Sequence, residues 1–200
     1  MTDKRLKNYD DLIKEEPDLS LLNRAYALLS TNFERATSQL AELADRGSIL
    51  SMIYLGEAYQ RSQPKNLDAA EKWYRKAYEN GAAMGLFALG LLHFQKNNYA
   101  EAETLFQEGA ENDDELSMFW LAKIYAHNDN FDKNRYKIRL LLEKSASKGN
   151  VSAKSALAFS FMKGRYGLGN IPKGIWLYLS SLLEAAKIAI KNPDDPRLWH

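Results

Sequence analysis

Hydrophobic residues recur along residues 51–81 at the spacing of two amphipathic helices joined by a loop. In the first helix, Leu55, Gly56 and Tyr59 fall on one side, at the i, i+1 and i+4 positions of an inward face. In the second helix, small and large residues alternate along one stripe, a pattern typical of helices that interlock at short distance. That stripe consists of Ala69, Ala70, Trp73, Tyr74 and Ala77. Because glycine costs a helix roughly 1 kcal/mol relative to alanine, Gly56 predicts that another group closely approaches the helix backbone at that point.

The same hairpin recurs along the chain in one register. Its small position recurs after 34, 32 and 36 residues, at Gly56, Gly90, Ala122 and Ala158. The stop after the second helix recurs with the same spacings, at Gly47, Gly81, Asp113 and Gly149. The position three residues after the small one is filled by Tyr59, His93, Tyr125 and Phe161. Three positions that keep one register indicate a helical repeat rather than unrelated amphipathic helices.

These hairpins resemble a known family. Residues 55–59 (LGEAY) and 73–77 (WYRKA) match the Sel-one-like repeat, a bacterial-type member of the tetratricopeptide-repeat superfamily, and the resemblance covers residues 48–190. Residues 163–173 (KGRYGLGNIPK) look like the loop between the two helices of that repeat. The third and fourth units depart from it, because Leu105-Phe106 and Leu141-Leu142 replace the Trp-Tyr pair. The resemblance implies an all-α fold, a right-handed α-solenoid of about five antiparallel helix hairpins.

The predicted organisation is one helical-repeat domain over residues 17–191. Its units span residues 17–47, 48–81, 82–113, 114–149 and 150–191. A polar extension (1–16) precedes it, and a tail (192–200) follows, which we expect to fold back through Leu198 and Trp199. The charged residues that interrupt the last hydrophobic helix, 174–191, are typical of a terminal cap.

Composition and charge narrow the possible functions. The chain has no cysteine, which excludes disulfides, thiol nucleophiles and zinc–thiolate sites. It shows neither a secretory signal nor the roughly 20-residue apolar run of a membrane span, so we expect a cytoplasmic protein without membrane insertion. Residues 1–130 carry 14 basic and 21 acidic groups (net −7), whereas residues 131–200 carry 13 and 5 (net +8). This asymmetry either orients a charged partner or reflects solvated outer faces.

The sequence offers little for catalysis. His93 occupies the tyrosine register of its repeat, where packing or hydrogen bonding is expected, and no two histidines have metal-ligand spacing with a carboxylate. Gly164, Gly167 and Gly169 imitate a phosphate-binding loop without a preceding strand. We therefore expect no enzyme, no catalytic residue, no metal and no cofactor. The basic cluster around Tyr136 could hold nucleic acid, but the near-neutral net charge of +1 argues against it as the main activity.

The resemblance implies that the first helices of the repeats line a concave groove. By register, the partner-binding residues are Ile53, Glu57, Phe87, Leu91, Phe94, Phe119, Lys123, His127, Phe159 and Met162, with Tyr26 and Ser155 at the equivalent positions of the outer units. Phe87 and Phe119 also fit a packing role between units. An apolar groove with Glu57 and Lys123 at its rim suits a helix or an extended peptide.

The resulting hypothesis is a non-catalytic scaffold or adaptor that binds a protein or peptide in this groove, with an unknown oligomeric state. An immunity-type inhibitor that neutralises a toxin or effector enzyme is the alternative. A glycan-linked role at the cell envelope is a third possibility. Glycan binding requires exposed aromatic rings, and Trp73, Trp120 and Trp176 are expected to be buried.

Overall fold

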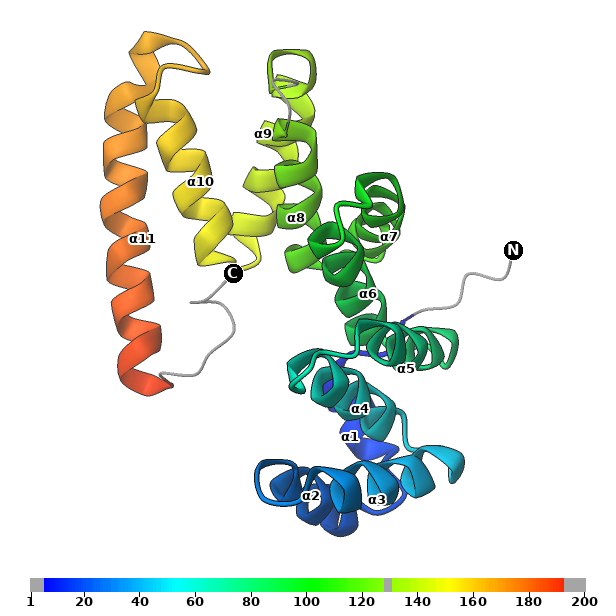
Figure 1. The fold of residues 1–200 in the computed structure, drawn as a ribbon. Helices are drawn as coiled ribbons and strands as arrows, with labels where there is room; N and C mark the ends of the chain where they lie inside the picture. The colour runs from blue at the N-terminus through cyan, green and yellow to red at the C-terminus, as the bar shows by residue number, and fades with distance from the viewer. Residues whose placement is uncertain (1–5, 128–130, 193–200) are drawn as a thin grey trace. The chain divides into compact units, whose positions relative to one another are not determined.

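The computed structural model describes residues 6–127 and 131–192, which are almost entirely helical (Figure 1). The chain divides into two compact units, residues 1–105 and 106–200. Within the described ranges there is no β-strand, and the one isolated β-bridge joins Lys7 to Ala82. The all-α class is therefore confirmed. The single domain over 17–191, with its five unit boundaries, stays a prediction, and the expected contacts of Leu198 and Trp199 lie outside the described residues.

The first unit contains six complete helices and the start of a seventh. These are α1 (Tyr9–Lys14), α2 (Leu19–Ala27), α3 (Phe33–Asp45), α4 (Ile49–Arg61), α5 (Leu67–Glu79), α6 (Ala83–Gln95) and the first residues of α7 (Tyr99–Glu111). A short 3₁₀ turn, Leu28–Ser30, extends α2. Two hydrophobic clusters fill this unit, one around Leu40, Leu43 and Leu55 and the other around Tyr74 and Leu89.

The second unit contains the longest helices of the chain. After the end of α7 come α8 (Glu115–Ala126), α9 (Phe131–Ser147), α10 (Val151–Met162), a 3₁₀ turn (Leu168–Asn170) and α11 (Ile171–Lys191). Helix α8 packs on α9, α9 on α10, and α10 on α11. Phe119, Ile138, Leu157 and Phe161 lie in its core cluster.

Backbone geometry at the helix ends explains the recurring stop positions. Gly47, Gly81 and Gly149 have φ values of 95°, 92° and 96°, and Asp113 has a φ of 66°. This left-handed conformation ends a helix, and glycine adopts it without steric cost. All four predicted stops are therefore confirmed, and Asp113 shows that a short polar residue can take the same place.

Side-chain caps mark the starts of the helices. The Asp18 carboxylate accepts a 2.9 Å hydrogen bond from the Leu21 N–H at the start of α2. Asn66 and Asn150 accept equivalent bonds at α5 and α10. Each cap satisfies one of the backbone N–H groups that a helix start leaves without a partner.

The predicted close approach at Gly56 is made by the ring of Tyr74. A Cβ atom on Gly56 would lie 2.4 Å from Tyr74 Cε1, so α4 and α5 pack at a distance that only glycine permits. Tyr74 is almost completely buried, and its hydroxyl donates a 2.8 Å hydrogen bond to Gln60 Oε1. Burial raises the pKa of Tyr74 well above its usual value, so the phenol remains a donor.

The N-terminal segment is an integral part of the first unit from Leu6 onward. Lys7 donates its N–H to the Gly81 carbonyl (2.7 Å) and accepts from the Ala83 N–H (3.0 Å), which ties it to the turn between α5 and α6. Leu12 of α1 is buried in the first hydrophobic cluster. The residues that looked like a polar extension therefore contribute to the core of this unit.

Helix α11 is held against α10 along one face. A Cβ atom on Gly174 would lie 2.8 Å from the backbone nitrogen of Met162, so the two helices are in close contact there. Farther along, Ser181 is buried and its hydroxyl lies 3.1 Å from that of Ser155, and Lys154 pairs with Glu184 at 2.8 Å. These contacts define the inner face of α11.

Candidate functional site

The strongest candidate site is an apolar pocket of about 250 Å³ in the second unit, between α8, α9 and α10. Eight apolar side chains form most of its wall, and three cationic side chains lie among them. The lining comprises Phe119, Ala122, Lys123, Ala126, Phe131, Ile138, Leu142, Ala156, Phe159, Ser160, Lys163 and Arg165. Among residues 6–127 and 131–192, no carboxylate belongs to this lining, so the described wall combines apolar side chains with positive charge.

The cations of this pocket lie against aromatic rings. Lys123 Nζ lies 3.6 Å from the centre of the Trp120 ring, and Arg165 Cζ lies 4.3 Å from that of Phe131. Cations are attracted to the negative face of an aromatic ring, which orients these two side chains. Partial burial lowers the pKa of Lys123, because the charged form loses water. A negatively charged group in the pocket would favour that charged form.

A second pocket, of about 420 Å³, lies in the first unit between α2, α3 and α4. Tyr26 and Phe33 contribute aromatic rings, and Glu57 and Arg61 contribute opposite charges. Burial raises the pKa of Glu57, with the Arg61 guanidinium acting in the opposite direction. This pocket is more polar than the one in the second unit and carries both signs of charge.

Five of the twelve positions in the predicted groove line one of these two pockets. Tyr26 and Glu57 line the first-unit pocket, and Phe119, Lys123 and Phe159 line the second-unit pocket. Phe159 is 48% exposed, so a partner could reach its ring. The two sets belong to different units and are described separately.

Seven of the twelve predicted groove positions line neither pocket. Ile53 is one of them, and at 1% exposure it is a core residue. Phe119 does line the second-unit pocket, but at 6% exposure it offers only an edge to it. The others are outside both pockets: Phe87, Leu91 and Phe94 on α6 are half-buried, Ser155 and Met162 on α10 are half-buried, and His127 is exposed after the end of α8. The groove as a partner-binding surface stays a prediction.

Sequence reasoning placed only Phe119, Lys123 and Phe159 of this lining in a site, and the residues it missed include Phe131, Lys163 and Arg165. A signal for Lys163 was present, since it lies four residues after Phe159 and therefore on the same helical side. Arg165 belongs to the loop after α10, and Phe131 begins α9. Their convergence depends on how the loop turns back, which no periodicity reveals.

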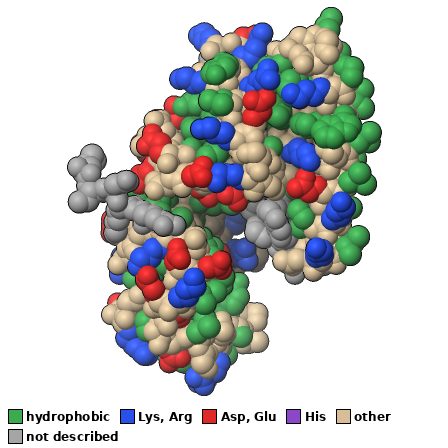
Figure 2. Space-filling model, turned by 180° about the vertical axis from the view of Figure 1, so that it is seen from behind, with side chains coloured by type: hydrophobic (Ala, Val, Ile, Leu, Met, Phe, Trp, Pro, Cys, Tyr) green, Lys and Arg blue, Asp and Glu red, His purple; other side chains and the backbone are tan. Residues whose placement is uncertain are grey.

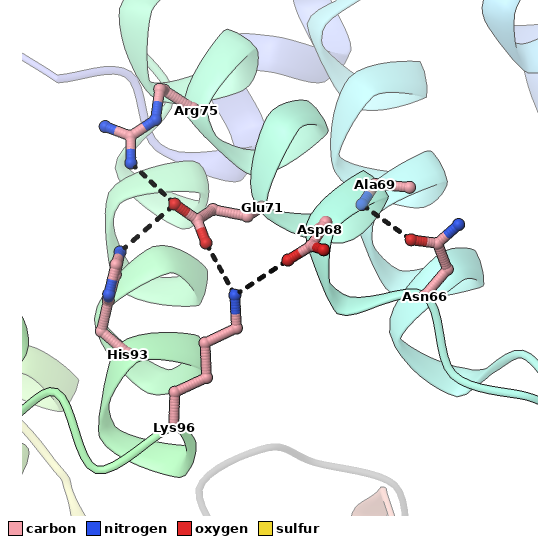
Figure 3. A network of polar contacts seen from close by, with 7 residues as sticks. All are labelled: Asn66, Asp68, Ala69, Glu71, Arg75, His93 and Lys96. Atoms are coloured by element: carbon pink, nitrogen blue, oxygen red, sulfur yellow. Dashed lines mark hydrogen bonds and ion pairs between the residues drawn. The ribbon is translucent and has the colours of Figure 1, made fainter.

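The histidine expected to have a packing role lies in a network of charged groups between α5 and α6 (Figure 3). His93 is buried, and its Nε2 lies 3.7 Å from Glu71 Oε1. Glu71 also accepts from Lys96 (2.9 Å) and Arg75 (3.0 Å). The hydrogen bond from Lys96 holds the pKa of Glu71 below its usual value, and the same bond raises the pKa of Lys96. The arrangement joins two helices and offers no nucleophile to the histidine.

The part of the chain that the structure describes contains no group of three metal-ligating side chains. None of its helices has the length and apolarity to cross a bilayer. The basic cluster of α9 is neutralised in part by its neighbours, because Arg135 pairs with Asp132, and Arg139 with Glu143 at 2.9 Å.

One burial prediction was wrong. Trp73 and Trp120 are half-buried, but Trp176 is 67% exposed on α11. The hydrophobic character of that helix indicated burial, whereas the helix is apolar on both its inner and its outer face. Because Trp176 is exposed, glycan binding is no longer disfavoured by the expected burial of the tryptophans.

Comparison with known proteins identifies the fold. No protein-family model matches the sequence, and neither does any curated protein. Among solved structures, a protective antigen of uropathogenic Escherichia coli strains with an SLR fold matches 88% of this chain at 20% identity and a TM-score of 0.68. The Sel1 repeat protein from Oxalobacter formigenes matches 88% at 19% identity and 0.64, and MamA matches 80% at 18% identity and 0.57.

The matched region is 40% of the length of the first of these proteins, 82% of the second and 93% of the third. All three structures are less than 25% identical to this chain in sequence, so the similarity shows the fold alone. They agree with the hairpin register, the left-handed stops and the consecutive packing of the helices described above. The chain therefore has the fold of these Sel1-repeat (SLR) structures, an α-solenoid of antiparallel helix hairpins.

Proposed function

We propose that this chain is a non-catalytic interaction scaffold whose second-unit pocket binds a protein segment that combines a large apolar side chain with acidic residues. Repeat proteins of this fold are generally protein-interaction scaffolds. The observation that carries the proposal is the lining of the pocket, in which an apolar wall is combined with the three cations Lys123, Lys163 and Arg165.

The size of the pocket favours a peptide over a small molecule. Its volume of about 250 Å³ is below the roughly 300–1,000 Å³ of typical small-molecule sites. It can accept one large side chain, which would lie against Phe131 and Phe159. Aromatic and aliphatic anchors of this kind supply most of the affinity in protein interfaces.

The charges of the pocket favour acidic residues beside that anchor. Lys163 and Arg165 follow α10 directly, and Lys123 lies on the facing helix α8. Carboxylates between these groups would form charge-assisted hydrogen bonds, and the attraction would fall as salt screens it. We therefore expect tighter binding at low ionic strength.

To test this proposal, peptides are selected from a random displayed library by their binding to the intact chain. Enriched peptides should carry an aromatic or long aliphatic residue next to Asp or Glu. The double variant Lys163→Glu/Arg165→Glu should weaken their binding by roughly 10-fold or more, since two attractive contacts become repulsive. Titration calorimetry at two salt concentrations measures the change.

The matched control is Lys133→Glu/Lys137→Glu, which makes the same change in charge on exposed positions of α9. The affinity of this control for the selected peptides should stay within about twofold of that of the parent chain, because these charges lie outside the pocket. Equal losses in the two double variants, or peptides without acidic residues, would contradict the proposal. Circular dichroism establishes that each variant is folded.

A further inference from the structure

The outer face of α11 carries an uncovered apolar stripe. Its members recur at the spacing of one helix side, over four turns of α11. They are Ile175, Trp176, Leu179, Leu182, Leu183 and Ile190, all exposed, with Leu183 at 66% and Ile190 at 84%. Figure 2 shows hydrophobic side chains along the edge of the molecule where α11 lies.

This stripe is the opposite of a terminal cap. A capping helix in a repeat array has a polar outer face that faces water. In α11 the residues that pack on α10, including Gly174 and Ser181, leave the larger apolar side chains on the other side. The charges that indicated a cap from the sequence lie elsewhere, since Glu184 pairs with Lys154 of α10.

The exposed area matches what a stable interface requires. Together the six side chains expose on the order of 700 Å², whereas the largest apolar patch of a typical monomer is about 300–600 Å². Stable protein interfaces bury roughly 800 Å² on each partner. The stripe therefore supplies most of one side of an interface by itself.

The order of residues along the stripe fits a second copy of the same helix running in the opposite direction. An antiparallel pairing centred between Leu182 and Leu183 sets Leu179 against Ala186 of the second copy, a large residue against a small one. It also sets Ile175 against Ile190. Small residues opposite large ones allow two helices to approach closely, and the contact is the self-complementary kind that a two-fold axis requires.

Charge supports the same arrangement. The stripe contains no charged residue between Ile175 and Leu183. Lys187 lies at its edge, and the antiparallel pairing places it beside Trp176 of the second copy rather than beside another lysine. An ammonium group next to an indole ring is a favourable contact. We therefore propose that two copies of this chain form a symmetric dimer through the outer faces of their α11 helices.

Oligomeric state is the first test. Light scattering or sedimentation of the full chain should give twice the 22.8 kDa mass of one chain at micromolar concentration. Leu179→Glu should raise the dissociation constant by roughly 100-fold or more, because each dimer would bury two unpaired carboxylates. Leu140→Glu makes the same change at an exposed leucine of α9 and should leave the dimer intact.

Cross-linking tests the antiparallel register. Because the chain has no native cysteine, any disulfide must form between the introduced residues. Leu183→Cys should form an inter-chain disulfide readily, since this residue lies next to its own counterpart across the two-fold axis. Ile175→Cys should not, because its counterpart would be roughly 20 Å away along the helices at 1.5 Å per residue. Mixed Ile175→Cys and Ile190→Cys chains should cross-link to each other.

Three results would overturn the proposal. A chain that is monomeric throughout the micromolar range would leave the stripe to another occupant, such as residues 193–200 or a different protein. A dimer that survives Leu179→Glu would form through another surface. Equal cross-linking of Leu183→Cys and Ile175→Cys would exclude the antiparallel pairing. Unchanged circular dichroism of the variants shows that each result reports association and not unfolding.

Discussion

At the scale of single residues, glycine and its neighbours show most directly how this sequence specifies its packing. Gly56 lies within a helix, where its intrinsic effect is unfavourable. The structure gives the reason for its presence, because the buried ring of Tyr74 occupies the space that a Cβ atom would need. The sequence predicted that another group closely approaches this backbone, and the structure confirms it, since that group is the Tyr74 ring.

Gly56→Ala should therefore destabilise the protein, although alanine is normally the better helix former. The overpacking cost of about 1–3 kcal/mol is offset by a gain in helix propensity of about 1 kcal/mol, so the free energy of unfolding should fall by up to about 2 kcal/mol. Denaturant unfolding measures this. Gly169→Ala, where no heavy atom lies within 4 Å of the new Cβ, is the control and should change little. A stabilised Gly56→Ala variant would show that the Tyr74 ring moves aside at little cost.

At the scale of helices, pairs are joined by small residues, caps and a few charged contacts. The contact between α5 and α6 is the best example, since Glu71 on α5 accepts hydrogen bonds from Lys96 on α6 and from Arg75 on its own helix. His93 lies near Oε1 of the same carboxylate, the oxygen that accepts from Arg75, whereas Lys96 donates to Oε2 (Figure 3). His93, which takes the place of the tyrosine in its repeat, thus adds a polar group to the interface between α5 and α6.

Removing the charge of Glu71 should weaken this contact in a pH-dependent way. Glu71→Gln should lower the free energy of unfolding by about 1 kcal/mol near pH 7, a value reduced by the partial solvent exposure of the network. The pKa of Glu71 is lowered in the folded state. Its contribution is therefore present above the unfolded pKa of about 4.3 and is lost as the pH falls through the lower folded value.

Urea unfolding of both proteins from neutral pH to pH 3 checks this prediction. The two stability curves should converge at acidic pH. Glu42→Gln on α3 makes the same change on an exposed carboxylate and serves as the control. A difference between Glu71→Gln and the parent that stays constant down to pH 3 would contradict the assigned role of the ionised carboxylate.

At the scale of the whole molecule, the second unit carries two surfaces of different character. The pocket between α8, α9 and α10 joins apolar side chains to three cations, whereas the stripe on α11 is apolar throughout. The first suits a charged partner segment and the second suits an identical helix. The inhibitor hypothesis stays a prediction, since a toxin could occupy either surface.

The two surfaces should act independently. The lining of the pocket includes no residue of α11, and the stripe includes none of α8, α9 or α10. Leu179→Glu should therefore bind the selected peptides with unchanged affinity, and Lys163→Glu/Arg165→Glu should keep the mass of a dimer. Calorimetry and sedimentation on both variants check this. Peptide affinity that falls when the dimer dissociates would show instead that the two surfaces are coupled.

Sequence alone determined the repeat in this protein, because register, caps and stops are local properties. The spacing of Gly56 from its equivalents and the left-handed stops at Gly47 and Gly149 each depend on a few adjacent residues. Their physical causes, φ preference and capping hydrogen bonds, act within one helix turn. A prediction from such signals needs no knowledge of the neighbouring hairpin.

Only the tertiary structure decided which apolar faces are covered. Ile53 and Trp176 are both apolar residues on helix faces that could pack, yet Ile53 is buried and Trp176 faces outward. The pocket likewise depends on Arg165 and Phe131 converging from a loop and a helix start. Hydrophobic periodicity shows that a side chain can be buried, but burial itself requires a second element, and the position of that element follows from packing across the whole unit.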